Sequence, residues 1–81
     1  MVPSDLIIKA KDRTGLTADI IEKIYAAKNV IFTEISAKVE RQEATIFLTI
    51  NVESLQRFLE IKKEISQIKG VSSVERVNGK R

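Results

Sequence analysis

The segment Asp12–Leu16, which reads Asp-Arg-Thr-Gly-Leu, holds the side chains of this sequence that are best suited to chemistry. Asp12 supplies a carboxylate, Arg13 a guanidinium and Thr14 a hydroxyl. Gly15 can adopt positive φ without steric cost and lets another group approach the backbone closely. A helix that begins here would present free N–H groups and the positive end of its dipole, which suit a carboxylate. We therefore take these five residues, Leu16 included, as the candidate ligand-binding site, in which Asp12 could accept a hydrogen bond from an ammonium group.

The same residues also suit a purely structural role. Asp12 and Thr14 can cap the helix, with Thr14 expected at the N-cap position, while Gly15 makes the turn and Arg13 lies in solvent. Capping requires nearly the same residue types as anion binding. The sequence is therefore compatible with a ligand site and with a loop that only connects the strand to the helix.

The amino-acid composition argues against several classes of catalytic and metal-binding site. The 81 residues include neither cysteine nor histidine, so thiolate catalysis, disulfides, histidine-based triads and zinc sites are not expected. We expect no metal and no cofactor. No apolar run approaches the roughly 20 residues that span a bilayer, and the first residues lack the pattern of a signal peptide. We therefore expect a cytoplasmic protein without a membrane partner.

Hydrophobic periodicity predicts the elements that would position this segment. Alternation with a period of two indicates strands, and apolar residues three or four positions apart indicate helices. The expected order is a strand over 5–11, a helix over 16–28, strands over 30–40 and 43–52, a helix over 54–69 and a strand over 71–77. Ser54 is expected to cap the second helix, and Gly70 to follow it in a left-handed conformation.

The polar segment 40–43 predicts a hairpin turn in which Val39 faces Ala44, although Arg41 and Gln42 are not the Asn-Gly pair that favours a two-residue loop. The order strand-helix-strand-strand-helix-strand then predicts one α+β domain over residues 1–81. Right-handed crossovers give it a ferredoxin-like βαββαβ architecture, with a four-stranded antiparallel sheet of order 4-1-3-2 and both helices on one face. The expected core comprises Leu6, Ile8, Ala10, Leu16, Ile20, Ile24, Ile31, Ile35, Ile46, Leu48, Ile50, Leu55, Phe58, Ile61, Ile65, Ile68 and Val74.

This architecture hosts several functions, and residue types decide among them. A heavy-metal carrier would need cysteines in the first loop, which are missing. Base-stacking RNA recognition needs aromatic platforms on the central strands, where only Phe47 is available. An acylphosphatase-like enzyme would use a loop arginine and a strand asparagine, for which Arg13 and Asn51 are the candidates, but its anion loop is longer and richer in glycine.

The chain resembles the ACT domain, a regulatory module that binds small molecules. The resemblance rests on Asp12, Arg13, Gly15, Leu16, Ile20, Asn29 and Val30, and it continues through ATIFLTINV and ISQIKGVSSVERV, so it covers nearly the whole chain. The last of these segments is most similar to the C-terminal ACT domain of the long RelA/SpoT-type (p)ppGpp synthetase/hydrolases. Many ACT domains have proline where this chain has Thr14.

The resemblance implies a non-catalytic regulatory domain that senses an amino acid or docks a partner, either within such a synthetase/hydrolase or as a free-standing dimer. It implies that the ligand lies between two copies. In the parent family it also implies contact with the ribosome, to which the net charge of +3 could contribute through RNA phosphates.

The sequence independently predicts a homodimer, or packing against a neighbouring domain of a longer parent protein. The expected edge strand 30–40 is long and β-branched, and such edges invite pairing with another chain. We expect the contact to use this edge or the sheet face opposite the helices, where Ile7, Phe32 and Phe47 are predicted to lie. The expected interface residues are Ile7, Phe32, Glu34, Ser36 and Phe47.

Overall fold

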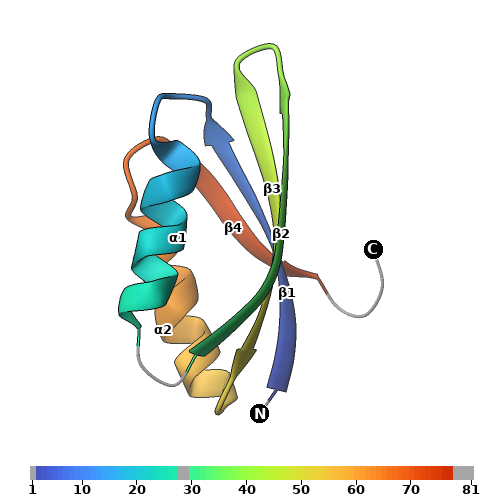
Figure 1. Ribbon diagram of the computed structural model, residues 1–81, viewed down its shortest axis with the longest axis vertical. Coiled ribbons are helices and arrows are strands. Elements are labelled where there is room, and N and C mark those ends of the chain that lie inside the picture. Colours follow the sequence, from blue (N-terminus) through green and yellow to red (C-terminus); the bar gives the residue numbers. More distant parts are fainter. Residues whose placement is uncertain (1, 28–29, 78–81) are drawn as a thin grey trace.

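The computed structural model describes residues 2–27 and 30–77 (Figure 1). Its elements are β1 (Val2–Lys11), α1 (Leu16–Ala26), β2 (Val30–Glu40), β3 (Glu43–Val52), α2 (Leu55–Ser66) and β4 (Val71–Val77). All neighbouring strands are antiparallel, and their order is β2-β3-β1-β4. Both helices cover one face of this sheet, as Figure 1 shows. The predicted ferredoxin-like architecture is confirmed.

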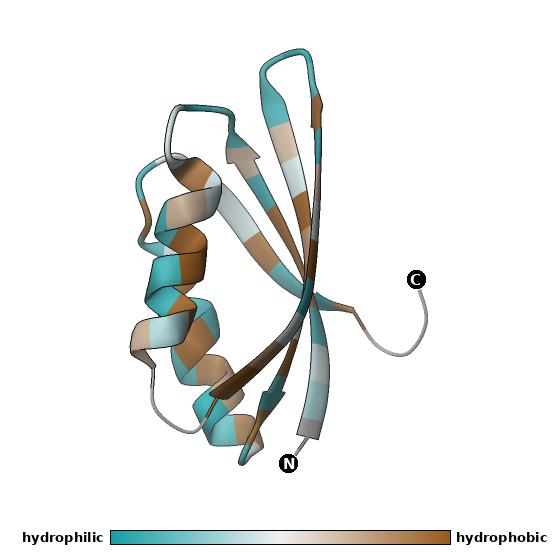
Figure 2. Cartoon of the chain, viewed as in Figure 1, coloured by the Kyte–Doolittle hydropathy of each residue, from teal (hydrophilic) through white to brown (hydrophobic). Residues whose placement is uncertain are grey.

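The core lies between the helices and the sheet face that they cover. Strand β3 alternates buried and less buried residues along its length. Figure 2, coloured by hydropathy, shows apolar stripes on both helices. The buried apolar residues are Leu6, Ile8, Ala10, Leu16, Ile20, Ile24, Ala44, Ile46, Leu48, Ile50, Val52, Phe58, Ile61, Ile65 and Val74. Ile35 and Ile68 are partly buried against them. Burial of this apolar surface is the main term that stabilises a domain of this size.

A β-bulge in β2 corrects two predicted positions. Phe32 pairs with Ile50 and Glu34 with Thr49, so Thr33 is an extra residue without a partner in β3. One extra residue inverts which side chains face the core on the preceding part of a strand. Phe32 therefore packs against the core and not on the open face, while Ile31, predicted in the core, is 52% exposed.

Leu55 was predicted in the core and is instead 57% exposed. It begins α2 at the edge of the apolar stripe, beside the exposed Leu59, because the 3.6-residue period turns it away from the line of Phe58 and Ile61. After the bulge, the predicted hairpin register is confirmed, with Val39 opposite Ala44.

The helix ends also differ from expectation. Gly15, with φ 83°, occupies the N-cap of α1 and no side chain caps the helix, so the prediction that Thr14 is the N-cap was wrong. Ser54 caps α2 as predicted, since its Oγ accepts a hydrogen bond of 3.2 Å from the Arg57 N–H. The helix over 16–28 ends earlier, at Ala26, and Lys28 and Asn29 lie outside the described residues. Helix α2 also ends earlier than expected, at Ser66, and Gly70 adopts φ 98° in the turn before β4.

Candidate functional site

The β1–α1 loop, residues 12–15, lies where two other connections meet it. The Lys11 N–H donates to the Gly70 carbonyl in the turn after α2, and the Asp12 N–H donates to the Gln42 carbonyl in the β2–β3 hairpin, both at 2.8 Å. Three segments far apart in the sequence are therefore tied together at one end of the sheet. This attachment holds the backbone of the candidate loop in one place relative to the core.

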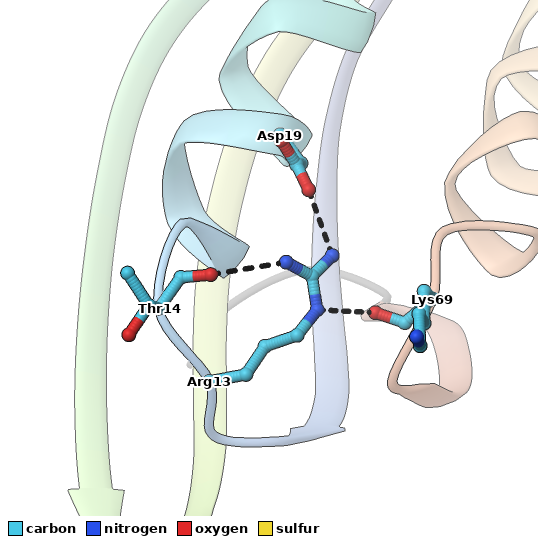
Figure 3. A network of polar contacts seen from close by, with 4 residues as sticks. All are labelled: Arg13, Thr14, Asp19 and Lys69. Atoms are coloured by element: carbon cyan, nitrogen blue, oxygen red, sulfur yellow. Dashed lines mark hydrogen bonds and ion pairs between the residues drawn. The ribbon is translucent and has the colours of Figure 1, made fainter.

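Arg13 connects this loop to α1 and to the turn that follows α2 (Figure 3). Its Nε donates to the Lys69 carbonyl at 2.8 Å, its Nη1 to the Thr14 carbonyl at 3.1 Å, and its Nη2 to Asp19 Oδ2 at 2.7 Å. The side chain is 29% exposed, so the expectation that Arg13 lies in solvent was wrong. We call Arg13, Asp19 and the Lys69 carbonyl the arginine clamp.

Sequence reasoning missed the partners of Arg13. Asp19 lies six positions later in the first turn of α1, where an acidic residue also suits the helix dipole, so its presence alone did not reveal the pair. Lys69 accepts through its backbone carbonyl, a group that every residue has, so the residue type does not indicate this contact. A flexible loop arginine followed by an aspartate in the next helical turn was the only available signal.

The first turn of α1 retains hydrogen-bonding capacity. The Leu16 N–H donates to the Arg13 carbonyl at 3.2 Å and the Asp19 N–H to the Gly15 carbonyl at 2.9 Å. In the part of the chain that the structure describes, the N–H groups of Thr17 and Ala18 have no such backbone acceptor. Two donors at the positive end of a helix can bind a carboxylate oxygen.

The five predicted ligand residues differ in what they can offer. Asp12, Thr14 and Gly15 are exposed, Arg13 is engaged in the clamp, and the side chain of Leu16 is buried in the core. A ligand could thus reach the Asp12 carboxylate and the backbone of Gly15, but Leu16 could contribute only through its backbone.

The structure brings together some of the predicted interface residues. Ile7, Phe47 and Ser36 form a row across β1, β3 and β2 on the face opposite the helices, and Glu34 pairs with Thr49 nearby. Phe32 lies on the other face, where its ring stacks on that of Tyr25 with centroids 5.8 Å apart.

The geometry rejects the acylphosphatase-like alternative. Asn51 pairs with Pro3, whereas the β1–α1 loop follows Lys11, which pairs with Glu43. The eight residue steps from Pro3 to Lys11 in an extended strand span about 26 Å, so Asn51 cannot orient water beside Arg13. No group of acidic side chains able to hold a metal is found among residues 2–27 and 30–77. The helices in that part are too short to span a bilayer.

Arg13→Ala should reveal how much the clamp stabilises the fold. The variant loses the ion pair to Asp19 and the bond to Lys69, and the partial exposure of the pair screens its contribution. We expect the free energy of unfolding, measured by urea denaturation, to fall by about 1 kcal/mol.

Lys38→Ala is the matched control, because Lys38 forms a more exposed ion pair with Glu40 at 3.8 Å. It should change the free energy of unfolding by less than about 0.5 kcal/mol. Equal losses in the two variants would mean that the clamp contributes nothing beyond a surface charge.

Comparison with known proteins gives one family and a set of similar folds. A family model described as the ACT domain matches residues 1–76. The ACT domain of GTP pyrophosphokinase from Chlorobium tepidum has a TM-score of 0.84 at 21% identity, with 94% of this chain and 97% of that chain covered. The C-terminal domain of MgtC from Mycobacterium tuberculosis gives 0.75 at 13% identity, covering 95% and 86%.

An ACT domain protein from Streptococcus pneumoniae has a TM-score of 0.69 at 19% identity, with 91% of this chain and 88% of that chain covered. Sequence comparison with curated proteins found no match. At these identities the solved structures establish the fold, and the family model covers most of the chain.

Proposed function

The chain belongs to the ACT domain family, whose members are regulatory and non-catalytic, and we propose that it senses an amino acid on behalf of an enzyme located elsewhere. The observation that carries this proposal is the first turn of α1, where the N–H groups of Thr17 and Ala18 lack backbone acceptors in the described chain. The exposed Asp12 precedes them across the loop. An amino acid has a carboxylate for such donors and an ammonium group for such a carboxylate.

The proposed parent is a (p)ppGpp synthetase/hydrolase, in which this chain would be the C-terminal regulatory domain. Two features support it: the helix-to-strand segment ISQIKGVSSVERV and the likeness to the GTP pyrophosphokinase ACT domain of Chlorobium. In such a parent, contact with ribosomal RNA through basic side chains would be sequence-independent and sensitive to salt. A cytoplasmic location is part of the same proposal.

The proposed ligand site is completed by a second copy that approaches along β2. Strand β2 is at the edge of the sheet, so one side of its backbone has no neighbouring strand among residues 2–27 and 30–77. Ile31 and Val39 near its two ends are both more than half exposed. Exposed backbone donors and acceptors with apolar side chains beside them favour pairing with another strand.

Regulation then follows from differential affinity. An amino acid that binds only the paired arrangement shifts the population toward it, by an amount equal to the difference in binding free energy between the two arrangements. The exposed β2 edge equally supports a second candidate, a free-standing dimeric amino-acid-binding protein. Sedimentation of the isolated chain distinguishes them, because a free-standing protein should dimerise at micromolar concentration without further domains.

Calorimetric titration with the twenty amino acids tests the sensor. We expect at least one to bind with a Kd between micromolar and millimolar, and Gly15→Val to weaken it at least about tenfold, since a β-branched residue strongly disfavours the φ of 83°. The loop would then move the donors of Thr17 and Ala18 out of position.

Gly15→Asn is the control, because asparagine tolerates left-handed backbone and a Cβ at Gly15 meets only Arg13 Nη1, at 3.9 Å. It should retain most of the affinity. If none of the twenty amino acids binds, the amino-acid sensor is contradicted and docking of a protein or RNA is favoured. If Gly15→Val binds the amino acid with undiminished affinity, this loop is not part of the site.

A further inference from the structure

A depression of about 500 Å³ lies beside the β2–β3 hairpin, apart from the β1–α1 loop residues discussed above. Strands β1, β3 and β4 contribute to it together with the hairpin turn. The side chains that could bind a ligand there are Lys9, Lys11, Arg41, Thr45, Ser72 and Ser73. Three cations and three hydroxyls from four segments therefore line one hollow.

Strand register explains why these side chains converge. Lys9 lies opposite Thr45 in β3 and opposite Ser73 in β4, so the three form a row across the sheet. Their neighbours Ile8 and Ile46 are buried under the helices, which places the row on the opposite, open face. The three side chains stay neighbours as long as β1, β3 and β4 keep this register, which also buries Ile8 and Ile46.

The depression carries an excess of positive charge. Lys9, Lys11 and Arg41 form no ion pair within 4.0 Å with any carboxylate among the described residues. Of the residues that the structure describes, Glu43 is the one acidic residue that lines the hollow, and it lies opposite Lys11. Unpaired cations that share a concave surface raise the local concentration of anions.

Backbone conformation gives an independent indication. Arg41 and Gln42 adopt φ values of 51° and 69°, a left-handed conformation for which two-residue hairpins normally use Asn-Gly. Left-handed backbone at residues other than glycine lowers stability and is common at binding sites. The turn thus keeps an arginine at the rim of the depression at the expense of stability.

We propose that this depression binds the phosphates of a nucleoside polyphosphate. Arginine, lysine and hydroxyl groups are the donors that phosphoryl oxygens require, and the volume is that of a small-molecule site. Phe47, on the same open face two residues beyond Thr45, lies about 7 Å further along β3 and pairs with Ile7. Its ring offers a surface on which a base can stack while the phosphates occupy the hollow.

Titration with GTP, ATP and inorganic tripolyphosphate tests the proposal at low and high salt. We expect nucleotide binding that weakens as salt rises, and a loss of about tenfold in affinity for Lys9→Ala and for Arg41→Gly. Lys63→Ala removes the same charge from α2, on the helical face, and should leave affinity within about twofold. An equal loss in Lys63→Ala would overturn the site.

Two further variants separate the components of the proposal. Arg41→Gly should raise Tm by roughly 4 °C or more while it weakens binding, because glycine relieves the left-handed turn.

Phe47→Ala should weaken the binding of GTP but not the binding of tripolyphosphate. Equal binding of all three anions, unaffected by Phe47→Ala, would overturn the nucleoside part, and tighter binding of a short RNA than of any nucleotide would replace it with an RNA surface. Gly15→Val should leave nucleotide affinity unchanged, so this test is independent of the amino-acid site.

Discussion

Phe58→Ala is expected to lower the free energy of unfolding by about 3 to 5 kcal/mol, as large-to-small changes of buried aromatic residues do. Phe58 is 2% exposed and belongs to the buried stripe of α2. The Arg76 guanidinium lies 5.3 Å from the centre of its ring, so a cation–π contact is lost as well. A small domain with a total stability of about 5 kcal/mol would then be largely unfolded. Urea denaturation followed by circular dichroism measures the loss.

Leu55→Ala is the control on the same helix. Leu55 begins α2, is more than half exposed, and buries little apolar surface. The same measurement should give a loss of less than about 1 kcal/mol for it. If Leu55→Ala destabilised the domain as much as Phe58→Ala does, α2 would have to be rotated about its axis relative to the sheet.

The contrast between these two residues shows what periodicity could predict. A strand with a period of two has only two faces, and one buried face fixes the register, which is why Ala44, Ile46 and Leu48 follow from the alternation of β3. A helix stripe has edges, and residues at an edge are buried or exposed according to where the helix lies on the sheet. Leu55 lies at such an edge, and its exposure depends on tertiary packing that the sequence does not reveal.

The bulge at Thr33 was beyond prediction for a different reason. The three residues before it, Val30, Ile31 and Phe32, are all apolar and so do not show which side chains face the core. Thr33 Oγ1 compensates locally by donating to the Thr49 carbonyl at 2.8 Å. Nothing in the residue types distinguishes an extra residue from a paired one. The consequence, an exchange of faces between Ile31 and Phe32, alters the predicted interface, because Phe32 now stacks on Tyr25 beside the β2 edge.

The sequence predicted a loop between the first strand and the first helix, as the structure has it, yet the contacts of Arg13 depend on a carbonyl 56 positions away. Contacts to a distant backbone atom are a property of the fold. The same holds for the hollow beside the hairpin, since Lys9, Thr45 and Ser73 become neighbours only after three strands pair. The residue types alone did not single out these groups, which only the topology brings together.

Gly70→Val should destabilise the domain by more than about 2 kcal/mol, because it adds crowding to backbone strain. Gly70 has φ 98°, and a Cβ there would lie 3.4 Å from the Lys11 carbonyl oxygen and 3.5 Å from Arg13 Nε. Arg13 Nε donates to the Lys69 carbonyl, and Lys11 is the residue whose N–H donates to the Gly70 carbonyl, so both neighbours take part in holding the β1–α1 loop to this turn. The side chain would therefore strain its own backbone and displace the arginine clamp.

Gly15→Val separates these two effects, because Gly15 has a similar φ of 83° but a Cβ there meets only Arg13 Nη1, at an ordinary contact distance of 3.9 Å. It should cost about 1 to 2 kcal/mol from conformation alone, and urea denaturation of both variants gives the difference. In the Arg13→Ala background the excess cost of Gly70→Val should shrink, since the clamp is then already absent. Equal losses for the two glycine variants, or an excess that persists without Arg13, would show that the clamp does not depend on the absence of a side chain at residue 70.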